Sequence, residues 1–396
     1  MTFRRRRHNR PNILLFWSHN DWGRYGRTYE KVAEQLARQP EIEQVICVFP
    51  PTTAAAGDHG ALTVKRVADN LYLVTQQLAP TDGRWSAVRR RAHDTRSTIE
   101  LLLFLRLRKG FRKDNTILWL FPPHPYLERL IRIVPHQLVI TQVVDNFALF
   151  DRRHWLHPYA EAQYPRLGAM SDLIVVASAL NHEIFGSSGT ECVRFDNAVD
   201  ETFIATPSPL PFREHGARPR VGYVGWITER TDLALLEYVA RARPDWSIVI
   251  AGPRYGDDVD TAGLATLPNV QFLGPLPYPE VPAFLGSLDV TVIPHRDTPY
   301  SRSMSPLKLY QYLASGRPVV STPIAGLDRV RPHIAVADSY DAFVHAIARA
   351  LERDTIDAAR TRIAAVQRET WPLRVRAMLE VVMLKYAQSR SPGQRR

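Results

Sequence analysis

The sequence predicts an α/β protein in which two doubly wound parallel sheets face each other across a cleft. Two observations indicate this fold class. The chain has 396 residues, a length that suits two domains, and 45% of them are apolar, which is enough to build two cores. Both halves also alternate short apolar runs with helical patterns, on either side of a proline-rich segment.

In the first half, the apolar runs are continuous and bounded by polar turns, as expected of parallel strands that are covered on both faces. Helical periodicity separates several of them, which is typical of βαβ units. We predict strands at residues 12–17, 45–49, 71–74, 116–121, 138–144 and 173–177, and helices at 29–38 and 97–107.

The composition changes between residues 200 and 219, where prolines cluster at 207–211. Proline is disfavoured in helix interiors and central strands, so we interpret this segment as an interdomain linker. The predicted domains are residues 1–203 and 204–370. Residues 371–396 should form a helix that packs back toward the first domain, followed by a disordered tail from residue 389.

The second half repeats the rhythm of the first. We predict strands at residues 220–224, 247–251, 270–273, 290–293 and 318–321, and helices at 233–242, 307–314 and 340–353. Two amphipathic helices follow at 358–369 and 373–388. Ligands of open parallel sheets bind beyond the carboxyl ends of the strands, so functional residues should follow the predicted strands.

The formal net charge of +11 suits nucleic acid, an anionic membrane surface or a phosphorylated substrate. We predict no nucleic-acid partner because no nucleic-acid-binding motif is present. No apolar stretch approaches the roughly 18 residues of a spanning helix, and two cysteines cannot form a disulfide framework. A cytoplasmic protein is therefore expected.

Basic residues flank the apolar helix predicted at 97–107, with arginines at 84–96 before it and lysines and arginines at 106–113 after it. This arrangement favours peripheral binding to an anionic membrane at its inner face. A solvated helix that covers the sheet is the alternative.

The segment 294–322 contains the strongest candidates for ligand binding. Ser305 stands where a helix N-cap is expected, with Pro306 at the first helical position. The start of a helix binds anions such as a diphosphate, and Lys308 lies in the first turn. Gln311 shares a face with Lys308 and could hydrogen-bond a ribose. An ordinary capped helix with surface polar residues is the alternative.

Three strands of the second half end in glycine, at Gly225, Gly252 and Gly274, where a ligand can approach the backbone. Arg230 follows the first of them. Its guanidinium could meet the same diphosphate from the side opposite to Lys308.

Four segments of the second half, in order, resemble the donor-binding half of GT-B glycosyltransferases, most closely the large retaining family 4. They read VGYVGWITERTD, PDWSIVIAGP, LPNVQFLGPLPYPEVPAFLGSLDVTVIPH and SPLKLYQYLASGRPVVST. In the first half, ILLFWSHNDWGRYGR, ILWLFPPHP, VVDNF and MSDLIVVASALNHEIF resemble a subgroup of these enzymes. The resemblance covers about residues 11–330. It implies two Rossmann-like domains, of which the first binds an acceptor and the second a nucleotide sugar.

The resemblance also implies roles for single residues. Arg230 and Lys308 match the basic pair that holds the donor diphosphate. Gln311 stands where the family usually has a ribose-binding glutamate, and Ser303 where it often has a glutamate near the transferred sugar. These departures leave open an enzyme that has lost activity. The candidate donor-binding residues are Gly23, Gly225, Arg230, Gly252, Ser303, Ser305, Lys308, Leu309 and Gln311.

The candidate catalytic residues lie in the first half. Asp145 matches an acidic position of the subgroup, where it could orient the acceptor or act as a base; capping the next helix is the alternative. Asp21 and His19 follow the first strand and could contact acceptor or sugar hydroxyls. For His19, a structural hydrogen-bonded imidazole is the alternative.

The expected function is therefore transfer of a sugar from a UDP- or GDP-sugar to a saccharide or lipid-linked acceptor, with retention, in bacterial polysaccharide or glycoconjugate synthesis. We expect no cofactor and no metal, because basic residues and a helix dipole stabilise the departing diphosphate in this fold. His154 and His157 lack a third ligand candidate. A nucleotide-sugar epimerase and a non-catalytic nucleotide-sugar-binding protein are the alternatives.

Overall fold

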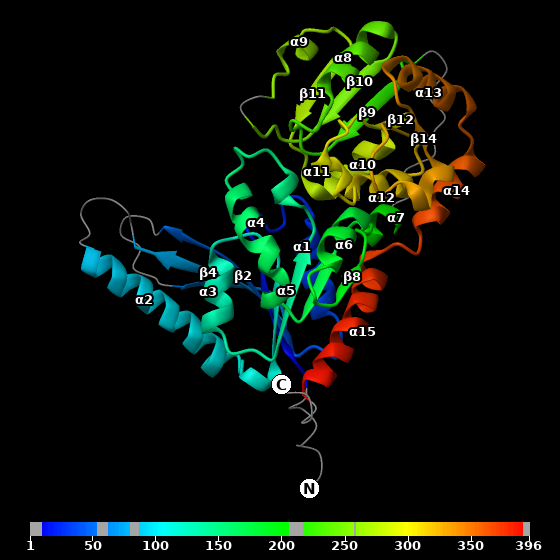
Figure 1. Cartoon of the computed structure of the whole chain (residues 1–396). Coiled ribbons are helices and arrows are strands. Elements are labelled where there is room, and N and C mark those ends of the chain that lie inside the picture. Colours follow the sequence, from blue (N-terminus) through cyan, green and yellow to red (C-terminus); the bar gives the residue numbers. More distant parts are fainter. Residues whose placement is uncertain (1–9, 54–61, 80–86, 206–216, 257–258, 391–396) are drawn as a thin grey trace.

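The computed structural model describes residues 10–53, 62–79, 87–205, 217–256 and 259–390, which form two α/β domains (Figure 1). Among these residues, eight strands form the sheet of the N-terminal domain. In spatial order they are β3 (Leu62–Ala68), β4 (Leu71–Leu78), β2 (Gln44–Thr53), β1 (Asn12–Phe16), β5 (Thr116–Leu120), β6 (Leu138–Val143), β7 (Leu173–Val176) and β8 (Cys192–Arg194).

The sheet of the C-terminal domain has six strands within the described ranges, and all its pairs are parallel. In spatial order they are β11 (Val270–Gly274), β10 (Ser247–Ala251), β9 (Arg220–Val224), β12 (Val290–Ile293), β13 (Val319–Ser321) and β14 (Ala335–Val336). The strand order reverses between β1 and β5 in the first sheet and between β9 and β12 in the second. The predicted α/β fold class is confirmed.

The helices of the N-terminal domain are α1 (Thr28–Ala37), α2 (Ala87–Leu103), η1 (Phe104–Arg108), η2 (Lys113–Asn115), α3 (Tyr126–Ile133), η3 (Phe147–Leu149), α4 (His157–Gln163), η4 (Tyr164–Arg166), α5 (Leu167–Met170) and α6 (Ala179–Gly186). Those that follow are α7 (Glu201–Ala205), α8 (Leu233–Ala242), α9 (Ala262–Ala265), η5 (Tyr278–Glu280), α10 (Val281–Gly286), α11 (Pro299–Arg302), α12 (Leu307–Ala314), η6 (Asp328–His333), α13 (Tyr340–Arg353), α14 (Ile356–Val366) and α15 (Trp371–Ser389).

The last helix, α15, returns from the C-terminal domain and packs along the N-terminal domain beside α1 (Figure 1). Trp371, Val375 and Met378 are buried in the same core cluster as Tyr29 of α1 and Trp119 of β5. This packing ties the end of the chain to the first sheet.

The structure departs from the predicted elements at two places. The predicted strands of the first sheet pair in parallel, but the prediction missed β3, an edge strand that pairs antiparallel with β4 through a short connection. The predicted tail begins too early, because Ser389 is the last residue of α15. The prolines at 207–211 and the tail residues 391–396 lie outside the described residues. In the part of the chain that the structure describes, no helix is long and apolar enough to span a bilayer.

Candidate active site

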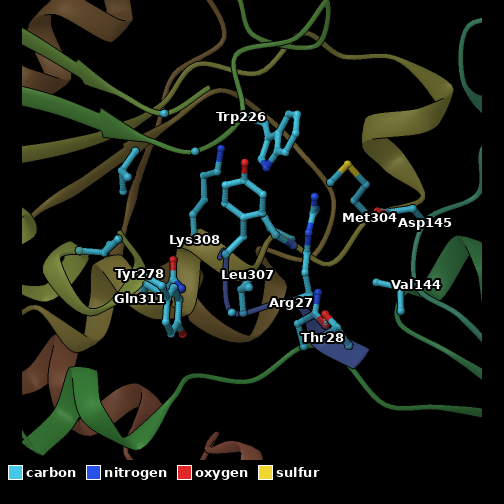
Figure 2. Close-up of a pocket in the computed structure, with 18 of the residues that line it drawn as sticks. Arg27, Thr28, Val144, Asp145, Trp226, Tyr278, Met304, Leu307, Lys308 and Gln311 are labelled. Carbon is cyan, nitrogen blue, oxygen red and sulfur yellow. Dashed lines mark hydrogen bonds between the residues drawn. The ribbon is translucent and has the colours of Figure 1, made fainter. Parts of the chain in front are cut away.

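A cavity of about 200 Å³ lies between the two domains, at the carboxyl ends of β1, β9 and β12 (Figure 2). In both sheets this is where the strand order reverses, the usual ligand position in open α/β sheets. The residues that line it from the N-terminal domain, here called the N-terminal wall, include Trp17, Tyr25, Arg27, Thr28, Asp145 and Asn197. The C-terminal wall includes Gly225, Trp226, Arg230, Tyr278, His295, Ser305, Lys308 and Gln311.

Lys308 lies in the first turn of α12 and extends into the cavity (Figure 2). Its Nζ donates to the Tyr223 hydroxyl at 2.6 Å and lies 3.2 Å from Nε2 of His295. Burial, and then the charge of Arg230, hold the pKa of Lys308 well below its ordinary value. The amine therefore lacks the negative partner that would stabilise its charged form.

Arg230 faces the same cavity from the loop after β9. Its Nη1 lies 3.1 Å from the sulfur of Met304, and its buried Nε has no hydrogen-bond partner among the described residues. A buried guanidinium with unused N–H groups is costly unless an anion satisfies it. Arg230 and Lys308 thus bring two poorly neutralised cations to one cavity.

Gly225 allows Lys308 to pass close to the backbone. The φ angle of Gly225 is +146°, a backbone conformation that residues with a side chain rarely adopt. A Cβ at this position would lie 2.8 Å from Nζ of Lys308. Gly252, the end of the neighbouring strand, packs directly on the carbonyl of Gly225. These glycine strand ends therefore make room for the amine as well as lining the cavity.

The prediction that Ser305 caps α12 is wrong. The residue before the helix is Pro306, and no side chain caps the first turn. The Ser305 hydroxyl instead accepts from the backbone N–H of Asn197 at 3.0 Å, and Asn197 Nδ2 donates to the Ser305 carbonyl at 2.7 Å. Thr28 donates to the Asn197 side chain at 2.9 Å. The loop before α12 is thus fixed to the N-terminal domain, and α12 begins at the cavity without a side-chain cap.

Asp145 follows β6 and lies on the N-terminal wall. Burial raises the pKa of its carboxyl group, while the charges of Arg230 and Arg27 oppose this rise. Its alternative role as a helix cap does not apply, because Asn146 caps the next helical turn by accepting from Ala148 N. The carboxylate therefore lies between cations from both domains.

Asp21 holds Arg27 instead of lining the cavity. Its two oxygens accept from Arg27 Nε at 2.9 Å and from the Tyr29 hydroxyl at 3.0 Å. These bonds orient the Asp21 carboxylate toward Arg27 and Tyr29, and Asp21 is not among the residues that line the cavity. Gln311 does line the cavity, where it lies beside Tyr278 (Figure 2).

Four other predicted residues also lie outside the cavity lining. His19 is hydrogen-bonded to the Ser18 hydroxyl, and the N–H of Gly23 donates to Oε2 of Glu30. Ser303 is fully buried and donates to the Tyr300 carbonyl at 2.8 Å. Leu309 lies on the core-facing side of α12 and is fully buried.

Sequence reasoning missed Arg27, Trp226 and His295. His295 comes directly after β12, so the rule that ligands gather beyond strand ends could have found it. Arg27 stands immediately before α1. Because a helix start attracts anions, a cation at this position could have been recognised as a second group facing an anionic ligand. Within the described ranges, no three His, Cys, Asp or Glu side chains gather in a way that could hold a metal ion.

Comparison with known proteins assigns this cavity to a family. Residues 218–353, which contain both Arg230 and Lys308, here called the basic cluster, match the family model Glycosyl transferases group 1. This chain is 33% identical over 336 residues to TuaH of Bacillus subtilis (strain 168). TuaH carries a provisional name as a teichuronic acid biosynthesis glycosyltransferase. The match covers 79% of this chain and 82% of the relative. The chain belongs to the group 1 glycosyltransferases. A nucleotide-sugar donor and an acceptor are therefore its substrates.

Solved structures agree with this glycosyltransferase on the fold. Sucrose-phosphate synthase from Thermosynechococcus elongatus superposes with a TM-score of 0.69 at 16% identity, covering 96% of this chain and 100% of that one. An α,α-trehalose-phosphate synthase (UDP-forming) from Burkholderia vietnamiensis gives a TM-score of 0.66 at 15% identity, covering 96% and 99%. The glycosyltransferase has the GT-B fold of two Rossmann-like domains.

Proposed function

We propose that this enzyme transfers a sugar from a UDP- or GDP-sugar to a hydroxyl of a saccharide or lipid-linked acceptor, with retention and without a metal. One observation supports the donor site most directly: Arg230 and Lys308 line the same cavity at the start of α12, close enough for the charge of Arg230 to lower the pKa of Lys308. The resemblance to retaining enzymes supports retention. The relative TuaH, through its name, supports a role in polysaccharide synthesis. Both matches are to glycosyltransferases, which favours transfer over the epimerase and the non-catalytic alternative.

The basic cluster suits a departing nucleoside diphosphate. When the bond between the anomeric carbon and the diphosphate breaks, negative charge develops on the phosphate oxygens. Cations that are already in place and shielded from water stabilise such charge far better than solvent does. Arg230 takes this role, and Lys308 joins it as the bound diphosphate raises the pKa of its amine. The N–H groups at the start of α12 add the positive end of a helix dipole.

Asp145 is our candidate for handling the acceptor. The acceptor oxygen forms the new bond to the anomeric carbon, and the hydroxyl proton must pass to a base. The carboxylate of Asp145 lies on the N-terminal wall within reach of the charge of Arg230, and burial raises its pKa, which strengthens it as a base. Retention requires the acceptor hydroxyl to approach the anomeric carbon on the face that the diphosphate leaves, so Asp145 would take the proton on that same face. Domain contacts then hold donor and acceptor together, a proximity effect.

We further propose that α2 and η1 rest on an anionic membrane. Ile99, Leu103 and Leu107 form an exposed apolar stripe, and Arg96 and Arg106 are exposed beside it. Apolar groups flanked by cations are typical of interfacial helices. The enzyme should therefore sediment with phosphatidylglycerol vesicles and stay in solution with phosphatidylcholine. Binding that Leu107→Asp leaves unchanged would contradict this placement.

Titration calorimetry with UDP, GDP and ADP tests the donor site. We expect one of the three nucleotides to bind, and Lys308→Ala and Arg230→Ala each to weaken that binding by about 10²–10³-fold, because each removes a cationic side chain from the cavity wall. Lys65→Ala, an exposed change on β3, serves as the charge-matched control. Lys308→Ala with unaltered nucleotide affinity and unaltered sugar transfer would remove the proposed role.

A further inference from the structure

A row of aromatic side chains leads out of the cavity to the surface and crosses from one domain to the other. Tyr25 meets Trp226 with ring centroids 5.3 Å apart, and Trp226 meets Tyr255 at 5.6 Å. Tyr255 lies 6.1 Å from His154, which lies 6.4 Å from Trp155. We call these five residues the aromatic strip. Tyr25 and Trp226 line the cavity, so the strip is continuous with the active site.

The outer end of the strip is open to solvent. Trp155 is 45% exposed and Tyr255 is 42% exposed. These two residues come from different domains, Trp155 from the loop before α4 and Tyr255 from the segment after β10. Large aromatic faces that remain exposed beside an active-site cleft indicate a binding surface.

Hydrogen-bond donors lie in the strip and beside it. The indole N–H of Trp226, in the strip, and that of Trp17, outside the strip on the N-terminal wall, are buried and have no partner among the described residues. Nδ1 of His154 accepts from Leu156 N at 3.2 Å, so the ring hydrogen lies on Nε2, where it can be donated. Burial lowers the pKa of His154 to about 4, so the ring is neutral near neutral pH. Exposed ring faces edged by neutral N–H donors suit a ligand with apolar C–H faces and hydroxyl groups.

We propose that the aromatic strip is an acceptor subsite for a saccharide of two or more sugar units. The C–H faces of sugar rings carry partial positive charge and pack on the negative faces of aromatic rings. The terminal sugar lies at Tyr25 and Trp226 with its hydroxyl in the cavity, and the preceding units extend toward Tyr255 and Trp155. The strip places five rings in succession, with centroid separations of 5.3 to 6.4 Å, which is more ring surface than one sugar unit can cover. This inference rests on the proposed function, since it names the acceptor class of the same cleft.

A glycan array of mono- to hexasaccharides, probed with the full chain and the nucleoside diphosphate that calorimetry selects, tests the subsite. Wild type should bind a subset of glycans with two or more units. Trp155→Ala and Tyr255→Ala should bind those glycans at least about tenfold more weakly, because each removes one stacking face. Trp155→Phe should retain most binding, whereas Trp155→Leu should not, since leucine has no ring.

Tyr238→Ala is the matched control, because Tyr238 is a similarly exposed aromatic residue on α8, outside the strip. The inference is overturned if no glycan binds, if single sugars bind as tightly as longer ones, or if Trp155→Ala binds like wild type. It is also overturned if a single-stranded oligothymidylate binds in a Trp155-dependent manner and no glycan does. Nucleotide affinity separates the two proposals: Trp155→Ala should keep it, whereas Lys308→Ala should lose it.

Discussion

The two walls of the cleft differ in chemistry although both line one cavity. The C-terminal wall is dense in positive charge, with Arg230 and Lys308 close together and His295 beside them. Burial, and then these two charges, hold the pKa of His295 well below its usual range, so it adds no positive charge of its own. This wall is built for one strong anion.

The N-terminal wall presents a carboxylate, an arginine that is already paired and aromatic rings. Asp21 holds Arg27, and the ring of Trp226 lies 5.2 Å from the Arg27 guanidinium across the cleft. Such a wall suits neutral, hydroxyl-rich molecules and proton transfer better than it suits a diphosphate. We propose from this difference that the charges that bind the donor diphosphate and the carboxylate that receives the acceptor proton come from different domains.

This division is tested most strongly by Asp145→Asn. If Asp145 accepts the proton of the acceptor, kcat for transfer should fall by about 10²–10⁴-fold. Nucleoside diphosphate affinity should stay the same or rise slightly, because the change removes a negative charge near Arg230. Steady-state kinetics and calorimetry on the same preparation measure both.

The matched control for that experiment is Asp338→Asn, an exposed carboxylate after β14. Two results would count against the division. One is transfer by Asp145→Asn at the wild-type rate. The other is a loss of nucleotide affinity as large as the loss of kcat, which would place Asp145 in donor binding.

The C-terminal wall was the more predictable of the two because its residues lie in short continuous segments. Strands followed by glycine and a helix with Lys308 in its first turn are local patterns that one sequence reveals. The wrong predictions for this wall concern residues whose side-chain direction is decided by tertiary packing. Leu309 adjoins Lys308 in sequence, but successive helical residues face different directions, and Leu309 faces the core.

The N-terminal wall could be predicted only in part. Asp145 follows a strand and was predicted from the family resemblance, and the structure places it in the cavity lining. The bond between Thr28 and Asn197, in contrast, joins residues 169 positions apart. The contact between Tyr25 and Trp226 forms only when the domains pack together. No spacing within one segment reports such contacts, because they depend on how separate elements are placed.

Gly225→Ala tests the C-terminal wall without removing a charge. The new Cβ would lie 2.8 Å from Nζ of Lys308, in a backbone conformation that costs about 1–3 kcal/mol for a side chain. We expect nucleotide affinity to fall by about 10–100-fold, as measured by calorimetry. Gly189→Ala is the control, since Gly189 also has a positive φ but open space around it. Equal effects of both changes would show that backbone strain alone, and not Lys308, is responsible.

The pH dependence of nucleotide binding tests the same wall in the wild-type chain, without a substitution, and the expected change in affinity is smaller. In the free enzyme, burial and Arg230 hold the pKa of Lys308 well below its ordinary value, and a bound diphosphate should raise that pKa. Binding then takes up a proton between the free and bound values, so affinity should fall as pH rises through this window. One proton limits the fall to about tenfold per pH unit.

Calorimetry in two buffers of different ionisation enthalpy measures the proton uptake directly. Lys308→Arg is the control, because a guanidinium stays charged throughout and should bind with little pH dependence. A wild-type affinity that is flat with pH, together with no proton uptake, would mean that Lys308 is already fully charged before the nucleotide arrives.

The smallest expected effect concerns the hydrogen bonds that join the two walls through Thr28, Asn197 and Ser305, here called the junction. Thr28→Val removes the donor to Asn197, the residue that fixes Ser305 before α12. Loss of one buried hydrogen bond should lower the free energy of unfolding by about 1 kcal/mol, measured by urea denaturation. Nucleotide affinity should fall no more than about fivefold, since the cations remain.

A double-mutant cycle of Thr28→Val with Ser305→Ala separates this junction from a purely local defect. If Asn197 transmits the position of one wall to the other, the two changes should be non-additive in nucleotide affinity, because the first already frees the loop that Ser305 anchors. Thr63→Val, on exposed β3, should be additive with Ser305→Ala. Additivity in both pairs would mean that each wall keeps its own geometry, and that the division of roles needs no mechanical link between the domains.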